Sequence, residues 1–120
     1  RDLKIIMAED NPANQKVAEI YLRKLNQNVK IVENGQRLIE ELEKESYDLI
    51  LLDIQMPVLN GIEALKIIRN SDKWKKIPVV GISAFGMLED VEKAVKIGMD
   101  DYILKPIQKE EFYEKIRKWM

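Results

Sequence analysis

The 120-residue sequence contains no cysteine and no histidine. Disulfides, zinc sites built on thiolates or imidazoles, cysteine nucleophiles and every catalytic triad or general base that needs histidine are therefore excluded. The sequence also lacks an excess of either charge, because 20 basic residues face 21 acidic ones and leave a net charge of −1. Since no basic block interleaved with aromatic residues stands out, we expect no binding of nucleic acid by this chain.

Long hydrophobic runs are missing as well. No apolar stretch approaches the roughly 20 residues of a membrane span, so we expect no membrane insertion. No signal peptide precedes the first apolar run, and we expect a cytoplasmic setting. At this length the chain should form one domain, residues 1–120, that buries its own core. Because the sequence starts at Arg1 without an initiator methionine, we also expect it to be excised from a longer protein.

Short apolar runs alternate with segments of helical periodicity along the chain. This alternation predicts an α/β fold in which crossover helices join parallel strands. The expected strands are 3–8, 29–32, 49–53, 79–83 and 102–104, and the expected helices are 14–25, 36–44, 62–69, 88–96 and 109–119. In the fourth helix, helical spacing predicts that Leu88, Val91 and Val95 face the core.

The order of the strands follows from their burial pattern. Residues 29–32 alternate apolar and polar side chains, which is typical of an edge strand. Right-handed crossovers cover both faces of the sheet only if the winding direction reverses once. With strands numbered in chain order, the predicted order is 2-1-3-4-5, a doubly wound (βα)5 three-layer sandwich. The first and third strands are then neighbours, and open α/β sheets bind ligands in the crevice at such carboxyl ends.

Three carboxylates fall at this crevice. Glu9 and Asp10 follow the first strand, and Asp53 ends the third. Carboxylates held together repel one another unless a divalent cation lies between them, and Mg2+ prefers such oxygen ligands. Ser83 and Lys105, at the ends of two other apolar runs, add a hydroxyl and a cation that suit phosphoryl oxygens. The pattern predicts a site that places phosphate on Asp53.

Four short motifs stand at the ends of the expected strands. They are Ala8-Glu9-Asp10-Asn11-Pro12, Leu52-Asp53-Ile54-Gln55-Met56-Pro57 with Gly61, Ile82-Ser83-Ala84, and Tyr102-Ile103-Leu104-Lys105-Pro106. Together they resemble two-component response-regulator receiver domains, over essentially the whole chain. The segment from Glu9 to Ala18 is most similar to receivers of hybrid sensor histidine kinases. The resemblance implies a flavodoxin-like fold and a phosphorylation-controlled switch in a two-component or phosphorelay system, not an enzyme.

The resemblance also implies a phosphoacceptor and a metal site. Asp53 would accept a phosphoryl group from a phosphohistidine on a histidine kinase or histidine phosphotransfer domain. A carboxylate nucleophile that forms an acyl phosphate is a known covalent strategy. Asp10, Asp53 and the backbone carbonyl of Gln55 would bind Mg2+ directly, or Mn2+ in its place, and Glu9 would bind it through water.

Further roles are implied for the remaining motif residues. Lys105 would hold phosphoryl oxygens, with a cis peptide bond to Pro106, and the Ser83 hydroxyl would donate a hydrogen bond to the same group. Tyr102 would move with Ser83 when the switch operates. Phe85, two residues beyond Ser83, would shield the acyl phosphate from water. The output surface is expected on the fourth helix, fifth strand and fifth helix.

Three alternatives stay open at this point. A stand-alone or transcription-factor-linked response regulator would carry the same domain. A haloacid-dehalogenase-like phosphatase also uses an Asp nucleophile with Mg2+, but it needs a second Asp at the position of Gln55. A flavodoxin-like module that binds FMN needs a phosphate loop rich in Ser, Thr and Gly, whereas Glu9-Asp10-Asn11 would repel the phosphate.

Overall fold

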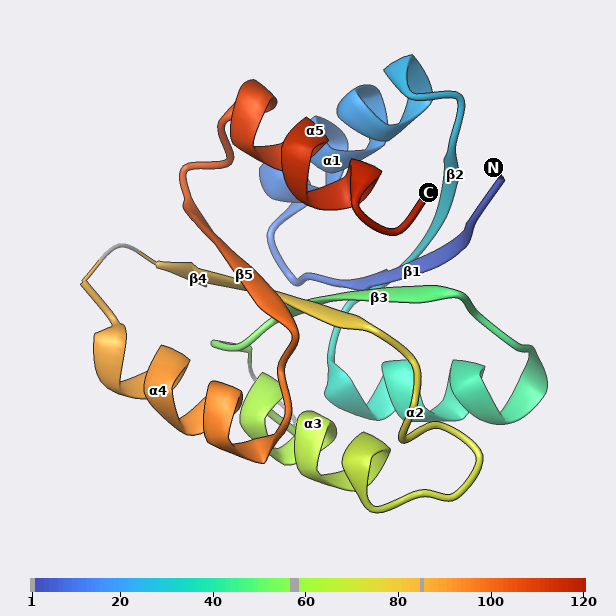
Figure 1. Cartoon of the computed structure of the whole chain (residues 1–120), viewed down its shortest axis with the longest axis vertical. Coiled ribbons are helices and arrows are strands. Elements are labelled where there is room, and N and C mark those ends of the chain that lie inside the picture. The colour runs from blue at the N-terminus through green and yellow to red at the C-terminus, as the bar shows by residue number, and fades with distance from the viewer. Residues whose placement is uncertain (1, 57–58, 85) are drawn as a thin grey trace.

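The computed structural model describes residues 2–56, 59–84 and 86–120. Within them, a parallel sheet lies between two layers of helices (Figure 1). The strands are β1 (Lys4–Ala8), β2 (Asn28–Val32), β3 (Leu49–Asp53), β4 (Val79–Ala84) and β5 (Asp101–Lys105). The helices are α1 (Pro12–Lys24), α2 (Gly35–Lys44), α3 (Gly61–Arg69), α4 (Leu88–Ile97) and α5 (Lys109–Arg117).

The sheet has the order β2-β1-β3-β4-β5, and every neighbouring pair is parallel. Helices α1 and α5 cover one face, and α2, α3 and α4 cover the other (Figure 1). The two faces bury separate core clusters, one around Leu22 and Phe112 and the other around Leu38, Leu65 and Ala94. The predicted α/β class, strand order and three-layer arrangement are therefore confirmed. Among the described helices, none combines the length and apolar character that a bilayer crossing requires.

Local signals explain where several elements begin. The Asn11 side chain accepts hydrogen bonds from the backbone amides of Ala13 and Asn14, and Pro12 occupies the first position of α1, where no hydrogen-bonded N–H is needed. Asn60 and Glu63 form a reciprocal capping box at the start of α3. These caps hold the amino-terminal ends of both helices next to the carboxyl ends of β1 and β3.

The expected inner face of α4 is wrong in part. Leu88 and Val95 are 62% and 52% exposed, whereas Val91 and Ala94 are buried. Spacings of three and four residues both place side chains on one helical face, so the sequence pattern alone does not choose between these stripes. The helix is turned so that the small Ala94 packs with Val91 and Met99 in the core, leaving two larger apolar side chains in solvent.

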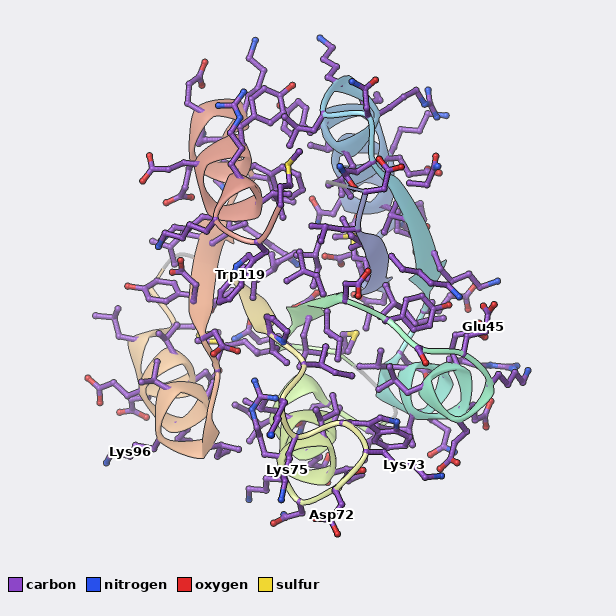
Figure 2. All side chains as sticks on the ribbon, turned by 45° about the vertical axis from the view of Figure 1, so that its right-hand side comes forward. Glu45, Asp72, Lys73, Lys75, Lys96 and Trp119 are labelled. Atoms are coloured by element: carbon purple, nitrogen blue, oxygen red, sulfur yellow. The ribbon has the colours of Figure 1, made fainter. Side chains whose placement is uncertain are left out.

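Charged side chains cover the outside of the molecule, as Figure 2 shows for Glu45, Asp72 and Lys96. Lys75 pairs with Asp72 at 3.2 Å in the loop after α3, where the Asp72 side chain is almost fully exposed and the Lys75 side chain is half exposed. Such exposed pairs contribute little to stability, typically about 0–1 kcal/mol. The buried charges at the carboxyl edge of the sheet are therefore the exception that needs an explanation.

Candidate functional site

The strand register brings the site together. Ala8 of β1 lies opposite Leu52 of β3, so Glu9 and Asp53 follow on adjacent strands. The backbone amide of Glu9 donates to Val32 of β2 at 3.0 Å and extends the pairing of β1 by one residue. All strands run in the same direction, so their carboxyl ends share one edge of the sheet. The clustering predicted from the strand ends is confirmed for these two carboxylates.

Asp53 is the centre of this cluster. Its side chain is fully buried at the end of β3. One carboxylate oxygen, Oδ1, accepts the backbone N–H of Gln55 at 2.9 Å, and the other, Oδ2, accepts the ammonium group of Lys105 at 2.9 Å. The carboxylate is thus held in a fixed orientation by two donors, one from the following loop and one from β5.

Glu9 is also fully buried, but its carboxylate is only half satisfied. Its Oε2 accepts the backbone N–H of Asn11 at 3.1 Å. Its Oε1 has no hydrogen-bond partner among the described residues, although the ammonium nitrogen of Lys105 lies 3.4 Å away. A buried carboxylate oxygen without a hydrogen-bond donor is energetically costly, so a further positively charged partner would stabilise this atom.

The electrostatics of the cluster follow from this burial. Desolvation, and then the negative charge of Asp53, raise the pKa of Glu9 to about 7, against the opposing effects of the Asn11 amide and Lys105. For Lys105, burial acts to lower the pKa, but its interactions with Asp53 and Glu9 outweigh that effect and raise it. One lysine therefore stabilises two buried carboxylates, and the balance of charge at the site stays negative.

The same carboxylates fit a divalent cation. Glu9, Asp10 and Asp53 each offer an oxygen, and these three atoms lie within 4.8 Å of one another. Asp10 is exposed and forms the solvent side of the group. Hard cations such as Mg2+ take oxygen ligands and retain several waters, which suits a small set of carboxylates open to solvent on one side. The Oε1 atom of Glu9, which has no hydrogen-bond donor among the described residues, agrees with such an ion.

Ser83 lies at the same edge but is linked to the cluster indirectly. It is fully buried near the end of β4. The side-chain amide of Gln55 donates to its Oγ at 3.4 Å and to Oδ2 of Asp90, in the first turn of α4, at 3.0 Å. The amide oxygen of Gln55 accepts the backbone N–H of Ala84 at 3.2 Å. Sequence reasoning missed Asp90, because nothing in the pattern of α4 indicates that this acidic residue reaches another loop.

The remaining predicted residues lie around this edge. The Lys105–Pro106 peptide bond is cis, as expected. Tyr102, on β5, is partly buried against the core cluster on the α2, α3 and α4 side of the sheet, with the Lys115 ammonium 5.8 Å from its ring centre. Phe85 lies outside the described residues. The structure thus brings Glu9, Asp10, Asp53 and Lys105 into one cluster and joins Ser83 to it through Gln55.

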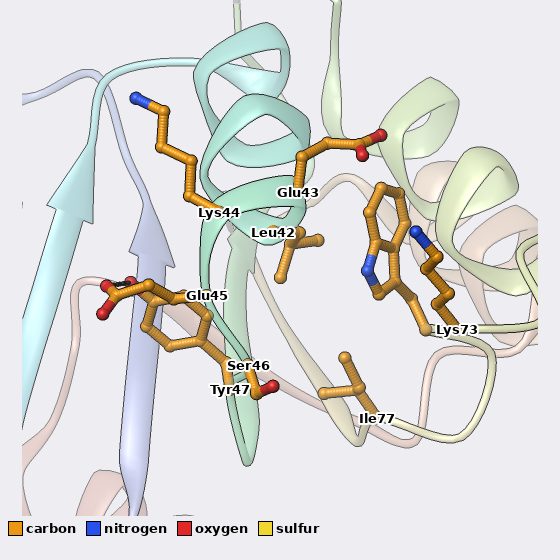
Figure 3. Close-up of a pocket in the computed structure, with 9 residues that line it drawn as sticks. Leu42, Glu43, Lys44, Glu45, Ser46, Tyr47, Lys73 and Ile77 are labelled. Atoms are coloured by element: carbon orange, nitrogen blue, oxygen red, sulfur yellow. Dashed lines mark hydrogen bonds between the residues drawn. The ribbon is translucent and has the colours of Figure 1, made fainter.

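A cavity of about 530 Å³ lies away from this site, between the end of α2 and the loop before β4 (Figure 3). Its lining includes Leu42, Tyr47, Trp74 and Ile77. Because Tyr47 and Ile77 precede β3 and β4, the cavity is at the amino-terminal edge of the sheet. It lacks the convergent buried charges of Glu9, Asp53 and Lys105, so the carboxylate edge is the stronger candidate for a functional site.

Comparisons with known proteins give a consistent result. A family model described as "Response regulator receiver domain" matches residues 5–117. The chain is 32% identical to the signal transduction histidine-protein kinase BarA of Escherichia coli over 98% of this chain and 13% of that protein. It is 38% identical to the hybrid signal transduction histidine kinase I of Dictyostelium discoideum, over 94% of this chain and 7% of that protein. The chain therefore spans a small part of these relatives.

Two solved structures are similar at the level of sequence as well as fold. The receiver domain of the sensor histidine kinase PA1611 from Pseudomonas aeruginosa, described with a magnesium ion coordinated in its active site cleft, is 34% identical. Its TM-score is 0.89, over 99% of this chain and 98% of that one. A complex of the Saccharomyces cerevisiae phosphotransfer protein Ypd1 with the Ssk1 receiver domain gives 31% identity and a TM-score of 0.89, over 98% of this chain and 88% of that one.

Proposed function

Because this chain belongs to the family of response-regulator receiver domains, we propose that it accepts a phosphoryl group on Asp53 and then serves as a conformational switch or relay. The observation that carries this proposal is the buried Asp53 carboxylate, held between the Lys105 ammonium and the Gln55 amide beside two further carboxylates. A catalytic base that requires histidine is excluded by composition. A carboxylate needs no histidine base to act as a nucleophile, so we assign that role to Asp53.

The chain's own residues account for the transfer. An oxygen of Asp53 attacks the phosphorus of a phosphohistidine, so a P–O bond forms while the P–N bond breaks and its electron pair stays on the imidazole nitrogen. The product is an acyl phosphate. Lys105, already at 2.9 Å from the carboxylate, is in place to neutralise charge on the phosphoryl oxygens, and Ser83 can donate its hydroxyl hydrogen to them. Phosphoryl transfer depends mainly on such positioning and electrostatic stabilisation.

A divalent cation would complete the site. Asp10, Asp53 and the backbone carbonyl of Gln55 would hold Mg2+ directly, Glu9 would hold it through water, and Mn2+ could replace it. The ion would supply positive charge that offsets both the carboxylates and the incoming phosphoryl group. The acidic cluster of this chain and the magnesium in the PA1611 receiver domain support this assignment.

The donor we propose is a histidine kinase or a histidine phosphotransfer domain. The relatives that are histidine kinases and the complex of the Ssk1 receiver domain with Ypd1 support this choice. Since the chain corresponds to a small fraction of the kinase sequences it matches, we propose that it is the receiver part of a hybrid sensor histidine kinase. A stand-alone or transcription-factor-linked regulator is the alternative.

For the output, we propose the surface of α4, β5 and α5. Phosphorylation adds up to two negative charges beside the end of β4, and Ser83 is drawn toward them. Tyr102, on the adjacent β5, then moves into the space that opens. Exposed Leu88 and Val95 on α4 support this surface, because apolar side chains in solvent are available to a partner.

Phosphotransfer tests the proposal. A histidine phosphotransfer domain carrying a labelled phosphoryl group is mixed with the chain and Mg2+, and label on each protein is followed with time. We expect the label to move to the wild type and to Asp72→Asn, a control at an exposed position, but not to Asp53→Asn. Transfer to Asp53→Asn at the wild-type rate would refute the assignment of the phosphoacceptor.

A further inference from the structure

The Gln55 side chain ties three separate segments together. Its Nε2 donates to Oδ2 of Asp90 at 3.0 Å and to Oγ of Ser83 at 3.4 Å, and its Oε1 accepts the backbone N–H of Ala84 at 3.2 Å. These contacts join the loop after β3, the end of β4 and the first turn of α4. The amide therefore uses both its oxygen and its nitrogen to restrain the strand end that faces Asp53.

The contact with Asp90 fixes this amide in place. Asp90 is the third residue of α4, and its carboxylate accepts a hydrogen bond from the side-chain amide of Gln55. Without this bond the amide would be free to turn toward Asp53. The residue before α4, Met87, makes no side-chain hydrogen bond to the helix. Among the described residues, the Gln55–Asp90 hydrogen bond thus connects the start of α4 with the loop that follows Asp53.

A phosphoryl group on Asp53 would compete with this arrangement. Its oxygens need donors at the end of β4, where Ala84 N–H is engaged by Gln55 and the Ser83 hydroxyl donates to the carbonyl of Ala84 at 3.3 Å. The strand end moves toward the phosphoryl group only if these contacts loosen. Since Asp90 holds Gln55 from the side of α4, it opposes that movement.

We propose that Asp90 is a positioning residue which, through the Gln55 side chain, holds Ser83 and Ala84 in the unphosphorylated arrangement and so weakens the affinity of the site for a phosphoryl group. The same hydrogen bond couples the start of α4 to the phosphorylation state of Asp53, because breaking it releases both the Gln55 side chain and the first turn of α4. This inference rests on the proposed phosphorylation of Asp53 and assigns its regulation to a residue outside the cluster of carboxylates and Lys105.

Beryllofluoride in the presence of Mg2+, a mimic of the phosphoryl group on an aspartate, measures this restraint. Its dissociation constant is determined by NMR titration for the wild type, Asp90→Ala, Asp90→Asn and Glu89→Gln. In Asp90→Asn the side chain keeps an oxygen that can accept the hydrogen bond from the Gln55 amide. Glu89→Gln is the charge control, because it removes one negative charge from an exposed side chain in the same turn. Gln55→Leu breaks the same link from the other end and leaves the sequence of α4 intact.

We expect Asp90→Ala and Gln55→Leu to bind the mimic about three- to tenfold more tightly than the wild type, as loss of one or two net hydrogen bonds would give. In the free Asp90→Ala protein the backbone amide signal of Ala84 should also move. Asp90→Asn and Glu89→Gln should stay near the wild-type affinity, which a purely structural role of Asp90 in α4 would not predict.

Two results would refute the role of the Gln55–Asp90 link and leave the proposed phosphorylation of Asp53 intact. Unchanged or weaker binding by Asp90→Ala and Gln55→Leu would show that the link does not restrain the site. Equal tightening by Asp90→Asn, Asp90→Ala and Glu89→Gln would show a general charge effect instead of a hydrogen bond. If the wild type itself fails to bind beryllofluoride, the proposed phosphoacceptor function fails and this inference fails with it.

Discussion

Replacing Glu9 with glutamine in the metal-free protein tests the electrostatics of the site. The pKa of Glu9 is raised from 4.5 to about 7 by burial and by the charge of Asp53. Between these two values the folded protein keeps a proton that the unfolded chain has released. The contribution of Glu9 to the free energy of unfolding is therefore most favourable below about pH 4.5 and is lost as the pH rises through about 7. One pKa unit is worth about 1.4 kcal/mol, so the loss is at most about 3.5 kcal/mol.

The Glu9→Gln protein should not show this loss. The glutamine oxygen can still accept the N–H of Asn11, while the uncharged amide no longer repels Asp53. Urea unfolding without metal, with a chelator present, should find Glu9→Gln about 1–3 kcal/mol more stable than the wild type near pH 8, and the difference should shrink toward pH 5. The chain has no histidine, so no imidazole titrates in this window.

Asp10→Asn is the matched control, because Asp10 belongs to the same group of carboxylates but is exposed. It should keep most of the wild-type pH dependence. Saturating Mg2+ should flatten the wild-type profile, since a bound cation favours the ionised form of Glu9. If Glu9→Gln loses stability with rising pH as steeply as the wild type does, the account of Glu9 is wrong.

Four further predictions concern the metal, two residues of the site and Arg69 at the end of α3. In thermal melts, Mg2+ should raise the melting temperature of the wild type in a concentration-dependent way, and Asp53→Asn should stabilise the metal-free protein because it removes one of the repelling charges. Lys105→Ala should slow phosphorylation by a small-molecule donor at least about tenfold in a rate assay, with an unchanged far-UV spectrum. Arg69 binds the carbonyl of Gly98 and the carboxylate of Asp100, each at 2.8 Å, so Arg69→Lys should cost about 1–3 kcal/mol in urea unfolding.

The sequence was sufficient to predict much of the site, for a topological reason. Uniformly apolar runs such as residues 49–52 identify central parallel strands, and parallel strands end at one edge. A polar residue at the end of such a run is therefore placed in space by its position in sequence. Glu9 and Asp53 were predicted in this way to lie close together, and the structure brings them together and buries both.

Contacts that depend on long side chains could not be predicted. Lys105 was expected to serve phosphoryl oxygens, and the structure also pairs it with Asp53 and Glu9 before any phosphate arrives. The bond from Gln55 to Asp90 depends on the rotation of α4, which the apolar pattern left undecided. The same ambiguity led to the wrong prediction that Leu88 and Val95 are buried. Local periodicity does not determine how a helix rotates against a sheet when a small residue such as alanine can pack there.

The central claim is that the phosphoryl group is carried by Asp53. The most direct measurement is to incubate the chain with Mg2+ and a small acyl phosphate donor, reduce the product with borohydride and map the modified residue by peptide mass spectrometry. Borohydride converts an aspartyl phosphate to homoserine, and we predict homoserine at position 53 alone, with none in Asp53→Asn. Homoserine at another aspartate, or an adduct that persists in Asp53→Asn, would contradict the account.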